Sequence, residues 1–355
     1  MKQIISRKYK RFILIFEITM FMMLLPIAYN FVPLNGGTKT FYMPSTDIKE
    51  VIHTLKKNGY EVTWVDNVML TLKQVPAAGW YSIQADTYGR FSFFMHLYTQ
   101  QTDELMDVVI YAGETKVELI KRLANDMKLD EKVLLQNYTA LAHFKEADIF
   151  SGRYTMARKA DENATIGYLF RESREKLEAF KKEYFSKKPD TLELKIVHII
   201  ASIIQKESNS IQEMPLISSV IYNRLKKGMK LQMDSTLNYD EYAHTIVTPE
   251  RIKSDESYYN TYKHKGLPPH PLSSVSIDAL KSAMKPVKSD YLFFMLNKEG
   301  THDFTATYAQ HLEKLKAFRT YQKERKVQKG IEQNIEKNAT KKKPFGLSIS
   351  RSAFK

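Results

Sequence analysis

The chain has 355 residues, enough for two domains, and no cysteine, which excludes disulfides, thiol catalysis, thiolate metal sites and a lipidated-cysteine anchor. Its formal net charge is +14, of which the first eleven residues contribute five and residues 322–355 contribute seven. The middle of the chain is therefore nearly neutral and has no basic face with interleaved aromatic residues, so we do not expect a nucleic-acid-binding protein.

A mostly apolar run, Phe12 to Val32, follows the basic stub at residues 1–11. At 1.5 Å per residue it reaches about 30 Å, the thickness of the hydrocarbon core of a bilayer. A cleaved signal peptide is the alternative, but the run is too long for one and no small-x-small cleavage site follows it. The sequence therefore predicts a transmembrane anchor at residues 12–32. Because Lys and Arg precede the run, residues 1–11 are expected in the cytoplasm and the rest of the chain outside.

The next part of the chain repeats one pattern. Residues 41–60 predict a strand, a turn and an amphipathic helix that Ser45 or Thr46 could cap. Residues 106–127 predict a second β-branched strand, turn and helix. We therefore expect a small α+β region over residues 38–145, either as a structural spacer or as a part that contacts a ligand.

The remaining segments differ in charge and periodicity. Residues 146–190 are highly charged and are predicted to form a helical connector with a solvated face. Residues 191–321 are mostly helical in pattern, except for a buried strand at 289–296 that is followed by a Gly-Thr-His turn and a short return strand. Residues 322–355 are basic and poor in apolar side chains, and are predicted to be a disordered tail.

One helix of this last domain carries a candidate catalytic acid. At helical spacing, one stripe consists of Ile196, Ile200, Ile203 and Glu207. A carboxyl held against apolar surface has a raised pKa, which a general acid needs to keep its proton near neutral pH. The alternative is an ordinary helix-end acid paired with Lys206 or Arg224.

Several long segments in this domain occur in the same order as in a known family. They are ASIIQKES, PLISSVIYNRLKKGMKLQMDST, YYNTYKHKGLPPHP, ALKSAMKPVKSDYLFFM and GTHDFTATYAQH. They resemble the endolytic murein transglycosylases, the YceG-like (MltG) group of bacterial cell-wall enzymes. YAGETKVELIKRLA (residues 111–124) more weakly resembles the family's upstream LysM-like part. The resemblance implies an α+β chain with an N-terminal transmembrane helix, a small LysM-like α+β region at 38–145, and a mostly helical YceG-like catalytic domain with a short β element at 191–321.

The resemblance also implies an activity. Such an enzyme is a peptidoglycan lyase that cleaves the MurNAc-GlcNAc β-1,4 bond within nascent glycan strands and leaves 1,6-anhydroMurNAc ends. It needs a single carboxyl, here Glu207, because the C6 hydroxyl of the sugar is the nucleophile. Polar and aromatic side chains in the matching segments are candidates for binding substrate: Asn223, Arg224, Gln232, Asp234, Thr236, Tyr259, Asn260 and Tyr262. Asp234 could instead fix its loop, or be a second catalytic carboxylate that would permit hydrolysis.

No cofactor or metal is expected, and His302 and His311, which also match, are expected to make hydrogen bonds. The implied partners are peptidoglycan strands, cell-wall synthesis enzymes and, through the N-terminal helix, the inner (cytoplasmic) membrane of a bacterium, with the catalytic domain outside the cytoplasm.

Departures from the family pattern support an alternative function. Family members commonly carry Glu where this chain has Gln205, and proline where it has Ser235. The chain also departs from the pattern in the loop at residues 270–276. If the family used position 205, this protein would be inactive. The alternative is therefore a catalytically inactive, membrane-anchored protein of the cell wall that binds glycan or acts as a scaffold.

Overall fold

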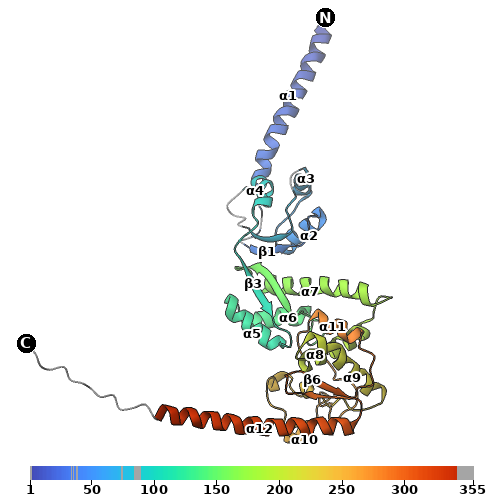
Figure 1. Cartoon of the computed structure of the whole chain (residues 1–355). Helices are drawn as coiled ribbons and strands as arrows, with labels where there is room; N and C mark the ends of the chain where they lie inside the picture. The colour runs from blue at the N-terminus through green and yellow to red at the C-terminus, as the bar shows by residue number, and fades with distance from the viewer. Residues whose placement is uncertain are drawn as a thin grey trace, which may run out of the picture. The chain divides into compact units, whose positions relative to one another are not determined.

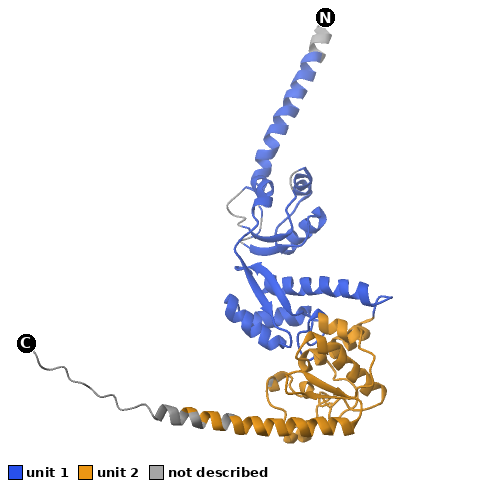
Figure 2. Cartoon of the chain, in the orientation of Figure 1, with its two compact units in different colours: residues 1–189, 272–277 blue, residues 190–271, 278–355 orange. Residues whose placement is uncertain are grey.

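The computed structural model describes residues 2–32, 34, 36, 39–72, 75–83 and 89–341. The chain divides into two compact units (Figure 2), which consist of residues 1–189 with 272–277 and of residues 190–271 with 278–355. The segment 272–277 thus belongs to the first unit although its neighbours in sequence belong to the second. Helices and small two-stranded antiparallel sheets make up both units (Figure 1), so the predicted mixture of helix and strand is confirmed.

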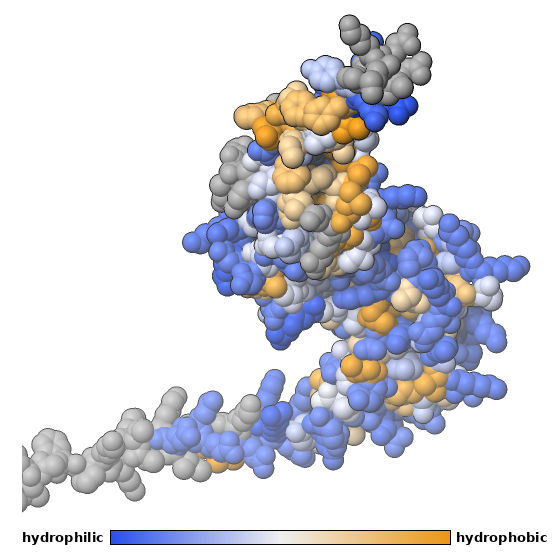
Figure 3. Space-filling model, turned by 90° about the horizontal axis from the view of Figure 1, so that it is seen from above, coloured by the Kyte–Doolittle hydropathy of each residue, from blue (hydrophilic) through white to orange (hydrophobic). Residues whose placement is uncertain are grey.

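The first unit begins with α1 (Lys2–Asn30), onto which the predicted anchor at residues 12–32 falls. Its stretch Lys8–Asn30 is long and apolar enough to cross a membrane, and none of that stretch is buried inside the protein. Apolar side chains gather on this helix in the space-filling view (Figure 3). Length and composition therefore permit a membrane span, and anchoring itself stays a prediction.

A βααβ unit follows α1. Its elements are β1 (Lys39–Met43), α2 (Ile48–Lys57), α3 (Trp64–Leu72) and β2 (Gly79–Ile83). The strands are antiparallel with Phe41 opposite Tyr81, and both of these side chains are buried in a core beneath the sheet. The cap of α2 is Asp47, whose carboxylate accepts backbone N–H groups of the first turn, so the prediction of Ser45 or Thr46 was wrong.

Next come α4 (Arg90–His96) and the short 3-10 helix η2 (Leu97–Thr99). Arg90 forms a fully buried ion pair with Asp66 of α3, in which two guanidinium nitrogens contact the two carboxylate oxygens at 3.1 and 2.6 Å. The same carboxylate accepts the backbone N–H and the hydroxyl of Thr63. Burial of these charges is tolerated because each has several partners.

A second βααβ unit completes the first compact unit. Its elements, with the helix that follows them, are β3 (Leu105–Ile110), α5 (Lys116–Met127), α6 (Glu131–Leu141), β4 (Gly152–Ala157) and α7 (Glu162–Tyr184). Thr115 and Glu118 form a capping box at the start of α5. The segment 272–277 is hydrogen-bonded to two loops of this unit, through Gly113 and Glu114 on one side and Ser151 on the other.

The connector predicted at residues 146–190 requires a correction. It contains α7 as expected, but also the strand β4, which pairs along its whole length with β3. Polar and apolar residues alternate in β4, and its inward side chains Tyr154 and Met156 are buried in the core of this unit. The upstream α+β region therefore extends beyond residue 145. Its LysM-like character stays a prediction.

The second unit is mostly helical. Its elements are α8 (Thr191–Glu207), η3 (Ile211–Glu213), α9 (Met214–Lys226), η4 (Asp234–Thr236), η5 (Asp240–Tyr242), α10 (Pro249–Ser254), α11 (Ile277–Met284), β5 (Phe293–Leu296), β6 (His302–Thr305) and α12 (Tyr308–Lys341). The predicted strand, turn and return strand are confirmed as the hairpin β5–β6, in which Phe293 lies opposite Thr305. The first strand is shorter than the predicted 289–296, and the prediction that it is buried was wrong, because its side chains are half-buried or exposed.

The predicted disordered tail at residues 322–355 is wrong for its first part, because α12 continues to Lys341. Residues 322–341 contain many Lys, Glu and Gln, which have high helix propensity, so the segment extends an existing helix without an apolar core. The side chains of α12 that are coloured in Figure 3 are mostly hydrophilic. Residues 342–355 lie outside the described part of the chain.

Candidate active site

Helix α8 places Glu207 at the edge of the second unit's core. The helix starts at a capping box formed by Asp190 and Glu193, and its last helical residue is Glu207, after which the backbone of Ser208 is extended. Ile200 and Ile203 on the expected stripe are fully buried. The fourth member of that stripe, Ile196, is 38% exposed, so the apolar stripe is shorter than predicted. Glu207 follows the buried Ile200 and Ile203 on the same face of the helix.

The carboxyl group of Glu207 lies against the loop that carries η4. Its Oε1 accepts the backbone N–H of Ser235 at 2.9 Å, and the side chain is half-buried. Burial raises the pKa of Glu207, contacts with the side chain and backbone of Ser235 act in the opposite direction, and the nearby charge of Asp234 raises it again. The net direction is upward, so the protonated form is favoured more than in an exposed glutamate.

Asp234 and Tyr262 form a second polar pair beside this acid. The hydroxyl of Tyr262 donates to Asp234 Oδ1 at 2.5 Å. Burial raises the pKa of the Tyr262 hydroxyl well above its ordinary range, and the hydrogen bond to Asp234 and the charges of Asp234 and Glu207 act in the same direction. Tyr262 therefore stays protonated and holds the Asp234 carboxylate in place from the 259–262 loop. The segments 232–236 and 259–262, which carry six of the eight predicted substrate-binding residues, thus lie together beside Glu207.

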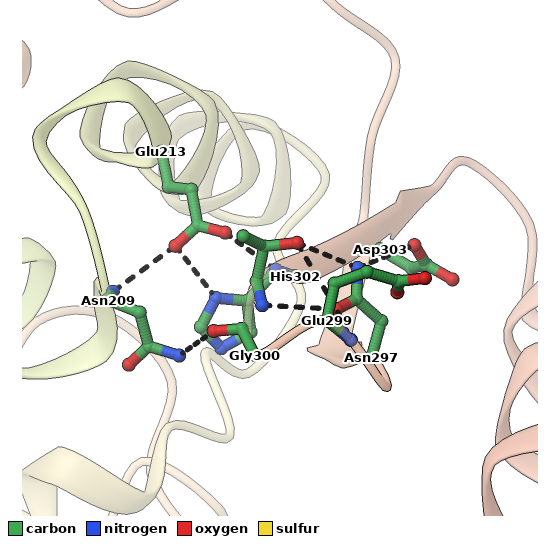
Figure 4. A network of polar contacts seen from close by, with 8 residues as sticks. Asn209, Glu213, Asn297, Glu299, Gly300, His302 and Asp303 are labelled. Atoms are coloured by element: carbon green, nitrogen blue, oxygen red, sulfur yellow. Dashed lines mark hydrogen bonds and ion pairs between the residues drawn. The ribbon is translucent and has the colours of Figure 1, made fainter. Parts of the chain in front are cut away.

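A network at the turn between β5 and β6 holds the chain just beyond Glu207 (Figure 4). Glu213 accepts the backbone N–H of His302 at 2.6 Å, His302 Nδ1 at 3.1 Å and the backbone N–H of Asn209 at 3.2 Å. Asn209 Nδ2 in turn donates to the carbonyl of Gly300 at 2.9 Å. Burial alone would raise the pKa of Glu213, but these hydrogen bonds outweigh it and the net pKa is lowered.

Four of the predicted substrate-binding residues have partners inside the protein. Asn223 Nδ2 donates to the carbonyls of Ser289 and Tyr291, and Arg224, 7% exposed, donates to the carbonyls of Leu231 and Leu292.

Thr236 and Asn260 are both 0% exposed. The Thr236 hydroxyl bonds Met233 and Thr261, and the Asn260 amide bonds backbone groups of its own loop. For Arg224, Thr236 and Asn260 the prediction of substrate contact is therefore corrected: these side chains hold the loops in place.

Asn223, which is half-buried, and the four other predicted residues remain candidates for substrate binding. Asp234 and Gln232 are exposed, and Gln232 adopts a left-handed backbone conformation with φ of +50°. Tyr259 stacks on Tyr239, with ring centroids 4.7 Å apart and planes 16° from parallel. Tyr262 is half-buried. These four side chains supply the hydroxyls, amide, carboxylate and flat rings that suit a carbohydrate.

The sequence predicted neither a functional role for Glu213 nor a contact between Ser235 and Glu207. Glu213 lies just before Pro215 at the start of α9, a position that reads as an ordinary helix-start acid. Ser235 lowers the pKa of Glu207 through its side chain and also through its backbone N–H, and a backbone contact of this kind is not visible in side-chain chemistry. The hydrogen-bonding role expected for His302 is confirmed. The ring of His311 stacks on Phe293, and its pKa is lowered, mainly by burial and also by the charge of Arg224.

In the part of the chain that the structure describes, no group of three or more His, Cys, Asp or Glu residues could hold a metal ion. Glu207 can donate or accept a proton in a setting of hydroxyls, amides and one ordered carboxylate.

The chain, with two upstream βααβ units and a mostly helical domain that carries Glu207, is similar to a known class of proteins. The sequence model of the YceG-like family matches residues 43–317, and the chain belongs to this family. A solved structure of a YceG-like protein from Listeria monocytogenes shares the fold, with a TM-score of 0.50 at 24% identity over 79% of this chain and 99% of that one.

Curated relatives carry a functional name. An endolytic murein transglycosylase of Bacillus subtilis is 38% identical over 112 residues, which make up 32% of this chain and 31% of the relative. An endolytic murein transglycosylase of Streptococcus pneumoniae is 32% identical over 156 residues, or 42% of this chain and 28% of the relative. The chain thus matches about a third of the length of these curated relatives.

Proposed function

We propose that this protein is a membrane-anchored endolytic peptidoglycan transglycosylase whose only catalytic carboxyl is that of Glu207. The observation that carries the proposal is the setting of this side chain, at the end of a buried helix, hydrogen-bonded to Ser235 and next to the Asp234–Tyr262 pair. The relatives named endolytic murein transglycosylase support the same activity. Burial raises the pKa of this carboxyl, as a general acid requires.

The proposed reaction moves one proton out of Glu207 and one proton back. Protonated Glu207 donates to the oxygen that links MurNAc C1 to the next GlcNAc, and this C–O bond breaks. The resulting carboxylate then takes the proton of the MurNAc C6 hydroxyl, whose oxygen bonds to C1. The products are a GlcNAc end with a free hydroxyl and a 1,6-anhydroMurNAc end, and no water is consumed.

The environment of the acid fits this double role. As a proton donor it is aided by burial and by the negative charge of Asp234, both of which raise its pKa. As a carboxylate it is aided by the N–H of Ser235, which stabilises the charged form. Gln205, where the family commonly has a second acid, cannot transfer a proton, and so the proposal does not use it.

The first unit supports a location at the membrane. Helix α1 has the length and composition of a span, and its flanking charges favour a cytoplasmic N-terminus. We propose a single-pass protein of the bacterial cytoplasmic membrane with both βααβ units outside the cytoplasm, where nascent glycan is made. The LysM-like part at residues 38–145 would contact glycan, and cell-wall synthesis enzymes would be partners.

Digestion of purified, uncrosslinked glycan strands by the full chain in detergent micelles tests the proposal. We expect internal cleavage with products lighter by one water than hydrolysis products, identified by mass spectrometry. Glu207→Gln should lower the rate by about 10²–10⁴-fold, the typical contribution of a general acid or base. Glu250→Gln, a matched change at an exposed glutamate of the second unit, should leave it unaltered.

Other outcomes would overturn the proposal in distinguishable ways. Products with reducing ends would identify a hydrolase and would give Asp234 the role of second carboxylate. Strand binding without any product would identify the inactive glycan-binding or scaffold protein that Gln205 and the altered 270–276 loop favour.

A further inference from the structure

A pocket of about 470 Å³ lies in the second unit between the β5–β6 turn and α12. The turn contributes Asn297 and Lys298, and the helix contributes Phe318, Tyr321, Arg325 and Lys326. Its volume is in the range of small-ligand sites. None of the residues assigned above to catalysis or to substrate binding lines it.

The pocket has an unbalanced charge. Lys298, Arg325 and Lys326 line it, and no Asp or Glu does. Lys298 makes only a loose ion pair with Glu299, at 3.7 Å and on the exposed surface. Among the residues that the structure describes, no ion pair is found for Arg325 or Lys326. Such a pocket favours an anionic ligand.

Two aromatic rings and the amides of Asn297 and Gln322 also line the pocket. Phe318 and Tyr321, three residues apart on α12, have ring centroids 6.4 Å apart, and both side chains are half-buried. Flat rings suit the faces of sugars, and the exposed Gln322 amide can bond hydroxyl groups. The Asn297 amide is already bonded within its own turn, to Thr301 and Asp303. Charge and shape together favour a carbohydrate that carries a carboxylate over a bare anion.

The turn that forms one wall is tied to the segment just after the catalytic helix. Asn209, two residues beyond Glu207, donates to the carbonyl of Gly300 in this turn (Figure 4), and Gly300 also lines the pocket. Glu213 fixes the same segment to His302 at the start of β6. The pocket is therefore held in a defined position relative to the candidate catalytic acid.

We infer that this pocket is a binding site for a carboxylate-bearing sugar, in which Lys298, Arg325 and Lys326 face the carboxylate and Tyr321 contacts the ring. The nature of the ligand rests on the proposed function, since MurNAc carries a lactyl carboxylate that GlcNAc lacks. The site would hold a MurNAc unit away from the scissile bond and so favour cleavage within strands.

Two disaccharides that differ only in the lactyl group, which carries the carboxylate, test the inference. We would titrate the full chain in detergent, in the Glu207→Gln background that prevents turnover, with the disaccharide GlcNAc-MurNAc and with the uncharged GlcNAc disaccharide. The charged probe should bind about fivefold more tightly at low salt, because exposed ion pairs contribute modestly. Added salt should remove most of this preference.

Variants of α12 assign the preference to the pocket. The double substitution Arg325→Gln and Lys326→Gln should abolish the preference for the charged disaccharide. Tyr321→Ala should weaken the binding of both disaccharides to a similar extent. Lys323→Gln, on the same helix, equally exposed but outside the pocket lining, should retain the preference.

Equal affinity of the wild-type site for the two probes would refute the inference. So would a loss of the preference for the charged probe in Lys323→Gln as large as that in the Arg325→Gln and Lys326→Gln double variant. So would tighter binding of inorganic phosphate, or of a short oligonucleotide, that depends on the same arginine and lysine. Failure of the proposed function appears separately, as the absence of cleavage by the wild-type chain, and leaves this binding measurement readable.

Discussion

Glu213 offers the sharpest test of how the candidate site is held together. It is 6% exposed and accepts three hydrogen bonds, one at Oε1 from the N–H of His302 and two at Oε2 from His302 Nδ1 and the N–H of Asn209. In Glu213→Gln the side chain keeps its size and one acceptor oxygen, which can face the two donors that Oε2 accepted, while the NH₂ group faces the N–H of His302. One hydrogen bond is lost, and the other two no longer go to a charged acceptor.

The magnitude follows from the one lost hydrogen bond and from the loss of the charge that the other two bonds meet. Hydrogen bonds to charged groups are worth about 1.5–3 kcal/mol each, and relief from burying the charge offsets part of the loss. We therefore expect the free energy of local opening to fall by about 3 kcal/mol, or about 100-fold faster amide hydrogen exchange. The affected peptides should cover residues 208–214 and 297–305. Tryptophan fluorescence cannot report this change, since Trp64 and Trp80 both belong to the first unit.

The pH dependence supplies a second readout. Because the pKa of Glu213 is lowered from its ordinary value of 4.5, its stabilising contribution is fully present above about pH 4.5 and is lost as the pH falls through the folded-state pKa. The difference between wild type and Glu213→Gln should therefore be largest near neutral pH and shrink in acid. Glu299→Gln, at an exposed carboxylate of the same turn, is the matched control and should exchange like wild type.

Wild-type exchange rates in Glu213→Gln would refute the reasoning, because they would show that the three hydrogen bonds do not hold the two segments together. A difference of the same size at pH 3 and at pH 7 would refute the electrostatic part alone.

Three further substitutions have expected outcomes. Ser235→Pro removes both the N–H donated to Glu207 and the serine side chain, so the pKa of this acid should rise further and the alkaline limb of kcat/KM against pH should move to higher pH. Ser235→Ala removes only the side-chain contribution and should give a smaller shift in the same direction. Asp66→Asn leaves Arg90 buried without its charge partner and should cost the first unit about 3–5 kcal/mol, measured by tryptophan fluorescence in urea. Asp148, whose pKa burial raises to about 6, makes the first unit less stable as pH rises from about 4 to about 6. Asp148→Asn should flatten this part of the curve of melting temperature against pH.

Each of these outcomes has a contrary result. If the alkaline limb does not move in Ser235→Pro, then the backbone N–H of Ser235 does not control the pKa of Glu207. A cost below about 1 kcal/mol for Asp66→Asn would mean that the Arg90 charge finds another partner or water. Parallel pH curves for wild type and Asp148→Asn would mean that this carboxyl does not titrate in the expected range.

The sequence predicted those parts of the site that depend on local pattern. The helix that ends at Glu207 follows from a run of isoleucines at helical spacing, and the hairpin from a short apolar strand followed by a turn. Strand β4 was not recognised because its partner β3 lies about 45 residues away, and charged neighbours hide its alternating pattern. The helical extension of α12 was missed because a polar composition was equated with disorder, although its residues favour helix.

The individual binding residues were harder to predict, for a reason that Thr236 and Asn260 illustrate. A hydroxyl or an amide in a loop has the same appearance in the sequence whether it bonds a ligand or a backbone carbonyl. Burial decides between the two, and it depends on which other loop packs against the residue. The Thr236 hydroxyl meets Thr261, a contact between segments 25 residues apart, and both side chains are buried.

The groups around Glu207 divide into those that set its proton affinity and those that set its position. Ser235 and Asp234 act on the proton in opposite directions, and the second of them is held by Tyr262 from another loop. Glu213 and His302 fix the chain immediately after the acid without touching its carboxyl. All of these residues belong to the second unit. The proton transfer proposed for Glu207 therefore involves residues of that unit alone.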